Sequence, residues 1–596
     1  MRIKHNSIIW YPLVISIAIV LGIVIGNYIS TKKFTLDKDR KINAVLNLIQ
    51  SEYVDSIDVK DLVEQAIPAI IGNLDPHSYY IPASDIRAEN EKLDGSLSGI
   101  GVSFFMMNDT ANVDQVIPNG PAEKVGMLAG DRIISVNGES IVGGTLTAEG
   151  IRSKIRGEKG TKVKIGVKRN SSKKTLTFTI TRDDIPMNTV DVSYMLDDKT
   201  GYIKIAQFGK NTYDEFFAAL SKLKKDGASR YIVDLRGNPG GYMEMAILMV
   251  NEFLEQGELI VYTKGRKERE DIQVWSDDQG SFHDAQVAVL IDEYSASASE
   301  ITSGALQDLD RAVVMGTRTY GKGLVQMPNV PLPYAGKLKL TTAKYYIPSG
   351  RCIQARKYKH TDNGYVAQEV ADSLTHEFRT ARGRIVRDGG GIKPDVEVKA
   401  DSLPNIAYYL ERADTTDVML NYEIDYMASH PTVAKPADFE VSDADYEAFK
   451  QAVLKSGFTY DQISEKYLKD LEDLARFEGY YNDAKDEFEA LKKKLQHNIE
   501  KDLDYAYNKK KIKEMLAADI MAAYYFEGGM IENSLRYDNQ YAEAAKLLTD
   551  KERYEKLLQP TPEEEKAASE NKKDSKKAAD KKTTDKNKGK SKDKKK

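Results

Sequence analysis

The chain has 596 residues, of which 41% are hydrophobic and 30% are charged, and its formal net charge is -5. This length predicts about four folding units, and the charged fraction excludes a polytopic membrane protein. A single cysteine, Cys352, excludes an internal disulfide framework and thiolate zinc sites. The near-neutral charge gives no general reason to expect a nucleic-acid partner.

The N-terminal end contains an uncharged, mostly aliphatic run from Ile8 to Ile29. As a helix rising about 1.5 Å per residue, this run is long enough to cross a bilayer. We expect an uncleaved single-pass membrane anchor, because the run is longer than the apolar part of most signal peptides and no A-x-A site follows. A cleaved signal peptide is the alternative. Basic residues flank the run on both sides, so the charges do not settle its orientation.

The C-terminal end, residues 561–596, has 14 lysines, eight acidic residues and no aromatic or large aliphatic side chain. Such a segment cannot bury enough apolar surface to fold, so it is predicted to be a disordered tail. A solvated spacer is the expected role. Contact with an anionic lipid, glycan or nucleic acid is the alternative.

A series of short β-rich segments runs from Ser98 to about Arg182: SGIGVSF, VIPNGPAEKVGMLAGDRIISVNG, TKVKIGVKR and KTLTFTITR. The ordered series resembles a PDZ domain. Ile100, Gly101 and Val102 match the carboxylate-binding loop of that domain, in which consecutive backbone N–H groups bind a peptide C-terminus. The resemblance therefore implies a peptide-binding site at these three residues.

After Asp184 the pattern changes to strand-like apolar runs separated by helix-length segments, which predicts a mainly parallel sheet covered on both faces. The expected strands are Tyr202–Ala206, Tyr231–Leu235, Leu259–Tyr262, Val287–Ile291 and Ala312–Met315. From Asp443 to Leu558 the sequence predicts long charged helices. One of them is expected to carry a stripe made of Phe488, Leu491, Leu495, Ile499 and Leu503.

The segment VAVLIDEYSASASEITSGALQD predicts a strand, a turn of small residues and then a helix that begins near Glu300. Ser295, Ser297 and Ser299 lie in this turn. A serine at the N-terminus of a helix is close to free backbone N–H groups that can stabilise an oxyanion. Upstream, LRGNPGG is a glycine turn that also follows a strand. These features favour acyl transfer, whereas a simple helix N-cap accounts for only one of the serines.

Two other chemistries fit the sequence less well. A Ser-His-Asp hydrolase should show GxSxG or a histidine with an evident role, and His283 is only a weak candidate base. The segment from Gly316 to Gly323 differs at one position from the pattern GxxxxGK[ST] of a nucleotide-binding P-loop. Gly323 stands where that loop needs a hydroxyl for magnesium, and a strand-like run follows instead of a helix.

A lysine is the remaining candidate base. An ordinary lysine has a pKa of about 10.4, so the site must lower the pKa by about 3 units to make an effective base at neutral pH. Lys322 lies between two glycines beside an apolar run, where burial can have this effect, and Gln326 offers an amide to orient it. A solvated loop lysine is the alternative.

The PDZ-like series, LRGNPGG, SASASEI, GALQD, RTYGKGLVQ and LKLTTAKYYIPSGR occur together in this order. From Lys41 to Val398 the chain resembles the C-terminal processing, or tail-specific, serine peptidases, whose core is similar to the Clp protease/crotonase fold. Departures at Tyr320, Leu324 and Cys352 remove no catalytic group. The resemblance implies a nucleophile at Ser297, a general base at Lys322, a lysine-orienting residue at Gln326, and an oxyanion hole formed by the amides of Ala298 and either Gly240 or Gly241, of which Gly241 is favoured.

The implied activity is endopeptidase cleavage of proteins whose free C-termini bind the PDZ domain, with no metal or other cofactor. The resemblance also implies that PDZ occupancy aligns Lys322 with Ser297, that the chain forms a homodimer through its N-terminal helices, and that the catalytic part is periplasmic, anchored in a bacterial inner membrane. The alternative is a catalytically inactive PDZ scaffold, which has no use for an intact Ser297, Lys322 and Gln326.

The expected fold class is a mixed α/β multidomain protein, with a PDZ domain before a Clp protease/crotonase-like core. The expected regions are an anchor (1–33), an N-terminal helical region (34–92), the PDZ domain (93–183), the peptidase core (184–415), a C-terminal helical region (416–560) and the lysine-rich tail (561–596).

Overall fold

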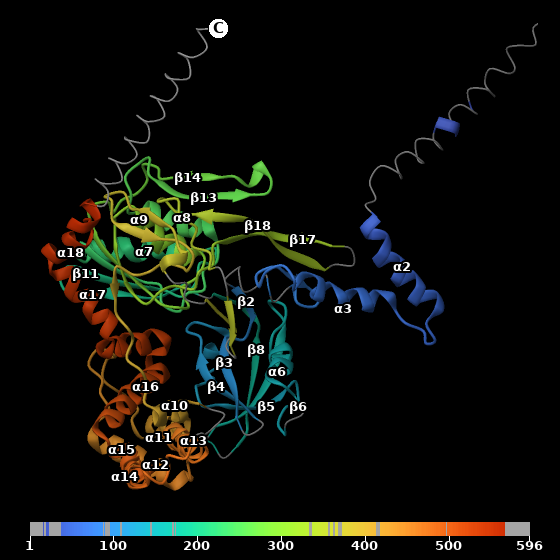
Figure 1. Ribbon diagram of the computed structural model, residues 1–596. Coiled ribbons are helices and arrows are strands. Elements are labelled where there is room, and N and C mark those ends of the chain that lie inside the picture. Colours follow the sequence, from blue (N-terminus) through green and yellow to red (C-terminus); the bar gives the residue numbers. More distant parts are fainter. Residues whose placement is uncertain are drawn as a thin grey trace, which may run out of the picture. The chain divides into compact units, whose positions relative to one another are not determined.

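The fold was analysed in a computed structural model (Figure 1). The chain divides into two compact units, one made of residues 1–84 and 327–341 and the other of residues 85–326 and 342–596. The structure describes residues 16, 20–22, 37–86, 89, 96–107, 110–143, 146–169, 172, 174–186, 188–332, 336–355, 358–361, 364–367, 372–412, 418–495 and 498–566. Most of the predicted tail lies outside these residues.

The first unit contains helices α2 (Asp37–Glu52) and α3 (Val59–Ile71), strand β1 (Tyr79–Ile81) and the adjoining ends of β17 (Leu324–Pro331) and β18 (Lys337–Tyr346). The Asp58 side chain caps α3 by accepting the amide of Lys60 at 2.8 Å. β1 pairs with β18 in antiparallel register, with Tyr79 opposite Lys339. The predicted N-terminal helices are therefore present, and the homodimer through them stays a prediction.

The predicted inner-membrane localisation is corrected by the structure. Among the residues described, no helix combines the length and the apolar composition needed to cross a bilayer. Most of the predicted span from Ile8 to Ile29 lies outside the described residues, and only Ser16 and residues 20–22 of it are described. The prediction rested on the composition and length of the run, and the described helices give it no support.

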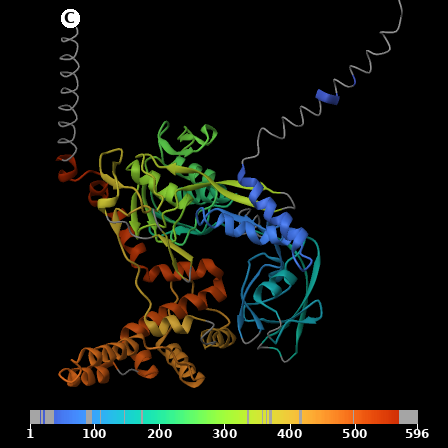
Figure 2. The same ribbon diagram turned by 45° about the vertical axis from the view of Figure 1, so that its right-hand side comes forward.

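The segment predicted to be a PDZ domain folds as a β-sheet with the strand order β3-β4-β5-β7-β8, and β6 pairs with β5. Buried aliphatic side chains such as Val113, Ile133 and Ile165 form its core together with Ile151 of helix α6. Figure 2 shows α6 in teal against the strands. Its elements are β2 (Ser96–Gly99), β3 (Val102–Met107), β4 (Thr110–Val116), α5 (Pro121–Lys124), β5 (Arg132–Val136), β6 (Glu139–Ser140), α6 (Ala148–Ile155), β7 (Lys162–Lys168), β8 (Leu176–Thr181) and β9 (Asp183–Pro186), which pairs with β2.

A second sheet has the order β10-β11-β12-β15-β16-β23, and Ser297 and Lys322 lie in loops that follow its strands β15 and β16. All neighbouring strands in it are parallel except β10 and β11, so the predicted mainly parallel sheet is confirmed. Alternate residues of its strands face opposite cores. The strands are β10 (Val190–Met195), β11 (Thr200–Ile205), β12 (Arg230–Asp234), β15 (Gln286–Ile291), β16 (Val313–Gly316) and β23 (Val396–Glu397).

Helices cover both faces of this sheet. Helices α7 (Thr212–Lys225), α8 (Met243–Asn251) and α9 (Ala298–Asp308) contribute to the core on one face. The other face packs against α17 (Asn539–Thr549) and α18 (Lys551–Leu557), which appear in red beside the green strands in Figure 1. Part of the segment expected to form a separate C-terminal helical region therefore completes the core of the sheet.

One predicted strand of the parallel sheet belongs elsewhere. β13 (Leu259–Gly265) covers the predicted strand Leu259–Tyr262 but pairs antiparallel with β14 (Gln273–Trp275) and with β18. The prediction was wrong for this strand because an apolar run does not specify its partner. Smaller elements are η1 (Glu268–Glu270), η3 (Asp372–Leu374) and the hairpins β19 (Tyr358–Thr361) with β20 (Gly364–Ala367) and β21 (Glu377–Arg379) with β22 (Ile385–Arg387).

Most of the remaining helices share a separate hydrophobic core that includes Phe449, Leu503 and Ile520, to which α13 and α14 contribute no residue. The predicted stripe from Phe488 to Leu503 does not lie on one helix, because α14 ends at Leu495 and α15 begins at Ile499. These helices are coloured from yellow-orange to red in Figure 2. They are α10 (Asn405–Glu411), α11 (Val418–Ser429), α12 (Asp443–Ser456), α13 (Ile463–Glu478), α14 (Lys485–Leu495), α15 (Ile499–Asp504) and α16 (Ala506–Ser534), followed by η4 (Leu535–Tyr537).

Candidate active site

Ser295 and Ser297 lie in the turn between β15 and α9, Ser299 lies in the first turn of α9, and the environments of the three serines differ. Ser295 is fully buried and donates its hydroxyl to the carbonyl oxygen of Leu235 at 2.8 Å. Ser299 is also fully buried and donates to the carbonyl oxygen of Asn238 at 2.9 Å. Ser297 is only half-buried and lies immediately before the first residue of α9. Burial therefore makes Ser297 the one serine of the three whose hydroxyl is presented at the helix N-terminus.

The backbone at Ser297 is held in an uncommon conformation. Its φ is +53°, in a region that residues other than glycine rarely occupy. Such strain persists only where surrounding contacts hold it, and it occurs often at functional sites. Here the amide of Ser297 donates to Oε2 of Glu300 at 2.9 Å. The strained turn is thus fixed from within the first turn of α9.

The LRGNPGG turn follows β12 and lies against the serine turn. The carbonyl oxygen of Asn238 accepts the amide of Ala296 at 3.0 Å, and Oδ1 of Asn238 accepts the amide of Gly240 at 2.8 Å. A Cβ atom on Gly240 would come within 2.6 Å of the Ala296 carbonyl oxygen and 2.9 Å of the Ser297 Cβ. Only glycine therefore allows this approach of the two turns.

The backbone amides of Gly241 and Ala298 differ from that of Gly240 in their hydrogen bonding. The Gly240 amide is engaged by Asn238, whereas the amides of Gly241 and Ala298 donate to no other residue in the described part of the chain. Gly241 has a φ of +148°, and a Cβ there would meet the Phe208 carbonyl oxygen at 2.1 Å. This arrangement favours Gly241 over Gly240 as the partner of Ala298.

Glu300 connects the serine turn to the lysine loop. Its carboxylate is fully buried and accepts four hydrogen bonds, which come from the amides of Ser297 (2.9 Å), Lys322 (2.8 Å) and Gly321 (2.7 Å) and from the Thr319 hydroxyl (2.6 Å). Burial raises the pKa of Glu300, and the four donors partly offset that rise. One carboxylate thus brings together the main chains of the two predicted catalytic residues, which are far apart in the sequence.

The structure places the other predicted residue of this group on β17. Gln326 is half-buried, and its side-chain amide donates to the carbonyl oxygen of Leu324 at 3.4 Å. Lys322 is also half-buried. The orientation of Lys322 by Gln326 stays a prediction.

Arg236 of the LRGNPGG turn forms a buried ion pair with Asp234, the last residue of β12. The Arg236 guanidinium contacts Asp234 at 2.6 Å, and it also contacts Asp538, the N-cap residue of α17, at 2.6 Å. The Tyr202 hydroxyl donates to Asp234 at 2.7 Å. Burial alone would raise the pKa of Asp234, but the charges of Arg236 and Lys204 and these hydrogen bonds bring it well below its usual value.

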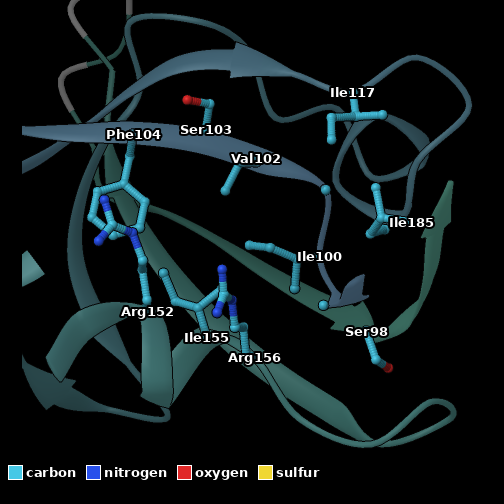
Figure 3. Close-up of a pocket in the computed structure, with 12 residues that line it drawn as sticks. Ser98, Ile100, Val102, Ser103, Phe104, Ile117, Arg152, Ile155, Arg156 and Ile185 are labelled. Atoms are coloured by element: carbon cyan, nitrogen blue, oxygen red, sulfur yellow. The ribbon is translucent and has the colours of Figure 1, made fainter. Parts of the chain in front are cut away.

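The PDZ-like sheet has a groove of about 230 Å³ at the predicted carboxylate-binding loop (Figure 3). The Ile100 carbonyl accepts the amide of Ala122 at 2.8 Å, and the Gly101 carbonyl accepts the amide of Ile117 at 2.9 Å. In a trans peptide the N–H points opposite to the preceding C=O. The amides of Gly101 and Val102 therefore point away from these internal contacts.

The walls of the groove are mainly apolar, with two arginines on one side. Ile155 and Ile185 line it together with Ile100 and Val102 of the predicted peptide-binding loop. Arg152 places its guanidinium over the Phe104 ring, 5.6 Å from the centroid, and Arg156 lines the same groove (Figure 3). An apolar groove with a positive edge suits the end of a peptide that carries a carboxylate.

Sequence reasoning missed the roles of Glu300 and Arg236. Ser297 and Glu300 match the S-x-x-E pattern of a helix N-terminus, and this pattern was available as a signal for Glu300. Its contacts with Gly321 and Lys322 could not be read from the sequence, because they join segments that only the fold brings together. The partner of Arg236 in α17 is hidden for the same reason.

Three segments of the chain match known protein families. Residues 199–364 match Peptidase family S41, residues 113–169 match the PDZ domain, and residues 406–548 match the C-terminal helical domain of probable PDZ-proteases.

Relatives resemble the chain over most of their own length. A carboxy-terminal-processing protease of Bartonella bacilliformis is 37% identical over 391 residues, which are 62% of this chain and 88% of that protein. A probable CtpA-like serine protease of Staphylococcus aureus is 34% identical over 349 residues, 58% of this chain and 69% of that protein.

Among solved structures, the photosystem II D1 C-terminal processing protease is 23% identical, with a TM-score of 0.32, over 61% of this chain and 94% of its own. The PDZ domain of the carboxy-terminal protease from Vibrio cholerae, in complex with a peptide, is 35% identical, with a TM-score of 0.14, over 15% of this chain and 97% of its own. The family resemblance seen in the motifs is confirmed by the sequence matches, and the chain belongs to peptidase family S41 as a PDZ-containing, C-terminal-processing serine protease.

Proposed function

We propose that the chain hydrolyses peptide bonds with Ser297 as the nucleophile and Lys322 as the general base, and that Gln326 orients the lysine. The observation that carries this proposal is the buried Glu300 carboxylate, which accepts the amides of both Ser297 and Lys322. The half-burial of Ser297, in contrast to the full burial of Ser295 and Ser299, supports the choice of nucleophile.

In the proposed reaction, neutral Lys322 accepts the proton of the Ser297 hydroxyl while Oγ attacks the carbonyl carbon of the substrate. The amides of Gly241 and Ala298 stabilise the oxyanion that forms. Lys322 then donates the proton to the leaving amine nitrogen, and an ester between Ser297 and the acyl part of the substrate remains. Water attacks this ester and gives its proton to Lys322, which returns it to the departing Ser297 oxygen.

We propose further that the PDZ groove binds the free C-terminus of a protein substrate. The carbonyl groups of Ile100 and Gly101 support this role, because they accept backbone amides from within the domain. The amides of Gly101 and Val102 therefore point in the opposite direction, away from these contacts. The positive charge of Arg152 and Arg156 along the apolar groove supports it as well.

The full chain should therefore cleave an unfolded polypeptide that ends in a free, apolar residue. Amidation of that C-terminus removes the negative charge, and we expect KM to rise by about 10- to 100-fold, as the loss of charged hydrogen bonds predicts. Initial rates at several substrate concentrations measure the effect, with Ser297→Ala as the background.

An unchanged KM for the amidated substrate would contradict recognition of the carboxylate. Binding of the free C-terminus without any cleavage would instead favour the inactive scaffold.

A further inference from the structure

Tyr345 on β18 contacts both predicted catalytic segments. Its side chain is 1% exposed, and its hydroxyl lies 3.1 Å from the carbonyl oxygen of Ser297. The same hydroxyl donates to the carbonyl oxygen of Lys322, the closer of its two contacts. The Tyr345 amide also donates to the carbonyl oxygen of Gly323 at 3.0 Å. Tyr345 therefore contacts Ser297, Lys322 and Gly323.

These contacts complement those of Glu300. The Glu300 carboxylate accepts the amides of Ser297 and Lys322, whereas the Tyr345 hydroxyl faces the carbonyl groups of the same two residues. The peptide units on both sides of each predicted catalytic residue are thus engaged by a buried side chain. A carboxylate and a hydroxyl together restrain the distance between the two main chains.

The position of the hydroxyl is set by packing. The Tyr345 ring belongs to the hydrophobic core on the α9 face of the parallel sheet, which also includes Ile347, Ile353 and Ile392. A buried aromatic ring has few rotamers, so its hydroxyl cannot follow a moving loop. The ring is a fixed point to which the lysine loop and the start of α9 are both attached.

We propose that Tyr345 is a positioning residue of the peptidase, which holds Lys322 within reach of the Ser297 hydroxyl. This inference rests on the proposed dyad. Tyr345 acts through the two main chains and touches no substrate. Without its hydroxyl, the lysine loop is free to shift away from α9 and toward solvent, which moves the pKa of the Lys322 ammonium toward that of an ordinary lysine.

The chain offers a matched control in Tyr231. This residue is also 1% exposed, belongs to the same core and donates its hydroxyl to a backbone carbonyl, that of Ala228, at 3.3 Å. Tyr231→Phe therefore removes a buried hydroxyl of the same kind without touching the catalytic segments.

The test compares Tyr345→Phe with Tyr231→Phe in the full chain. We expect Tyr345→Phe to lower kcat by about 5- to 30-fold, as the loss of one buried hydrogen bond at the reacting groups predicts. KM should stay within about twofold, because the substrate contacts are unchanged. The acid limb of the pH profile of kcat/KM should move to higher pH. Tyr231→Phe should change none of these, although both variants lower Tm by similar amounts.

Incorporation of 3-fluorotyrosine at position 345 keeps the ring and the hydroxyl, and we expect it to retain kcat within about threefold of the unmodified enzyme. Equal kcat and equal acid limbs in Tyr345→Phe and Tyr231→Phe would overturn the inference. So would a loss of activity in the fluorotyrosine protein as large as in Tyr345→Phe. Residual full activity in Ser297→Ala or Lys322→Ala would instead overturn the proposed dyad itself.

Discussion

Replacement of Glu300 by glutamine is expected to lower kcat/KM by at least about 100-fold, because small displacements of catalytic groups have effects of this size. The carboxylate accepts four hydrogen bonds from the serine turn and the lysine loop. A glutamine side chain has one acceptor oxygen, and its NH₂ group would face two of the donors. The loop of Lys322 would then lose part of its attachment to the serine turn.

The same substitution should destabilise the fold by about 3 kcal/mol, since buried donors lose their acceptor. Glu293→Gln is the control, because Glu293 lies in the loop just before α9 but is exposed, and among the described residues its carboxylate accepts the Thr317 hydroxyl alone. Steady-state cleavage and the urea midpoint of both variants measure the two effects. A Glu300→Gln enzyme as active as the Glu293→Gln enzyme would contradict the role given to this carboxylate.

The raised pKa of Glu300 also predicts how activity depends on pH. Because burial raises this pKa, acidification protonates Glu300 at a higher pH than an ordinary glutamate. The added proton would lie on an oxygen that already accepts two donors. The acid limb should therefore contain two losses of activity, one as the Lys322 base becomes protonated and one as Glu300 becomes protonated.

Replacement of Arg236 by alanine is expected to destabilise the protein by about 3–5 kcal/mol, the usual effect of leaving a buried charge without its partner. Asp234 is fully buried, and of its described partners it would keep the Tyr202 hydroxyl, the backbone amide of residue 236 at 3.0 Å and the more distant Lys204 ammonium, at 4.0 Å, but no close positive charge. The contact between the LRGNPGG turn and Asp538 of α17 would be lost as well. Urea unfolding of the full chain measures the change.

Arg230→Ala is the matched control for this prediction. Arg230 starts the same strand, β12, and pairs with Asp197, whose side chain is 41% exposed. An ion pair with one partner this exposed contributes about 1 kcal/mol or less. Equal unfolding midpoints for the Arg236 and Arg230 variants would contradict the importance of the buried pair.

The way in which stability depends on pH also distinguishes the unmutated protein from Arg236→Ala. In the unmutated protein the pKa of Asp234 is lowered, so its stabilising contribution is complete above the pKa of an unfolded aspartate and is lost as the pH falls below it. In Arg236→Ala the burial is no longer offset, so the pKa of Asp234 should rise. The variant should then gain stability as the pH falls from neutral toward the pKa of an unfolded aspartate, while this group leaves the unmutated protein unchanged there.

The motifs of this chain predict more of the fold than of the site. The alternation of apolar runs and helix-length segments correctly predicts β11, β12, β15 and β16, because buried parallel strands have this pattern. The same pattern misplaces β13, whose pairing with β14 and β18 depends on tertiary contacts. An apolar run shows that a strand is buried but does not show which strand is its neighbour.

For the site, the sequence brings three serines to one turn, and only burial separates Ser297 from Ser295 and Ser299. The sequence does not mark Glu300 or Tyr345 as a residue of the site, since the S-x-x-E pattern of Glu300 indicates only a helix N-terminus and a tyrosine in a strand is common. Their importance comes from contacts with Lys322, a residue on another segment. Such contacts between distant segments are visible only once the chain is folded.

Labelling with a fluorophosphonate, followed by mass spectrometry of the peptides, tests the catalytic dyad most directly. The reagent reacts with a serine hydroxyl only where a base removes its proton. We expect one adduct, on Ser297, and slow or absent labelling in Lys322→Ala. An adduct on Ser295 or Ser299, or unchanged labelling of Ser297 in Lys322→Ala, would contradict the proposed dyad.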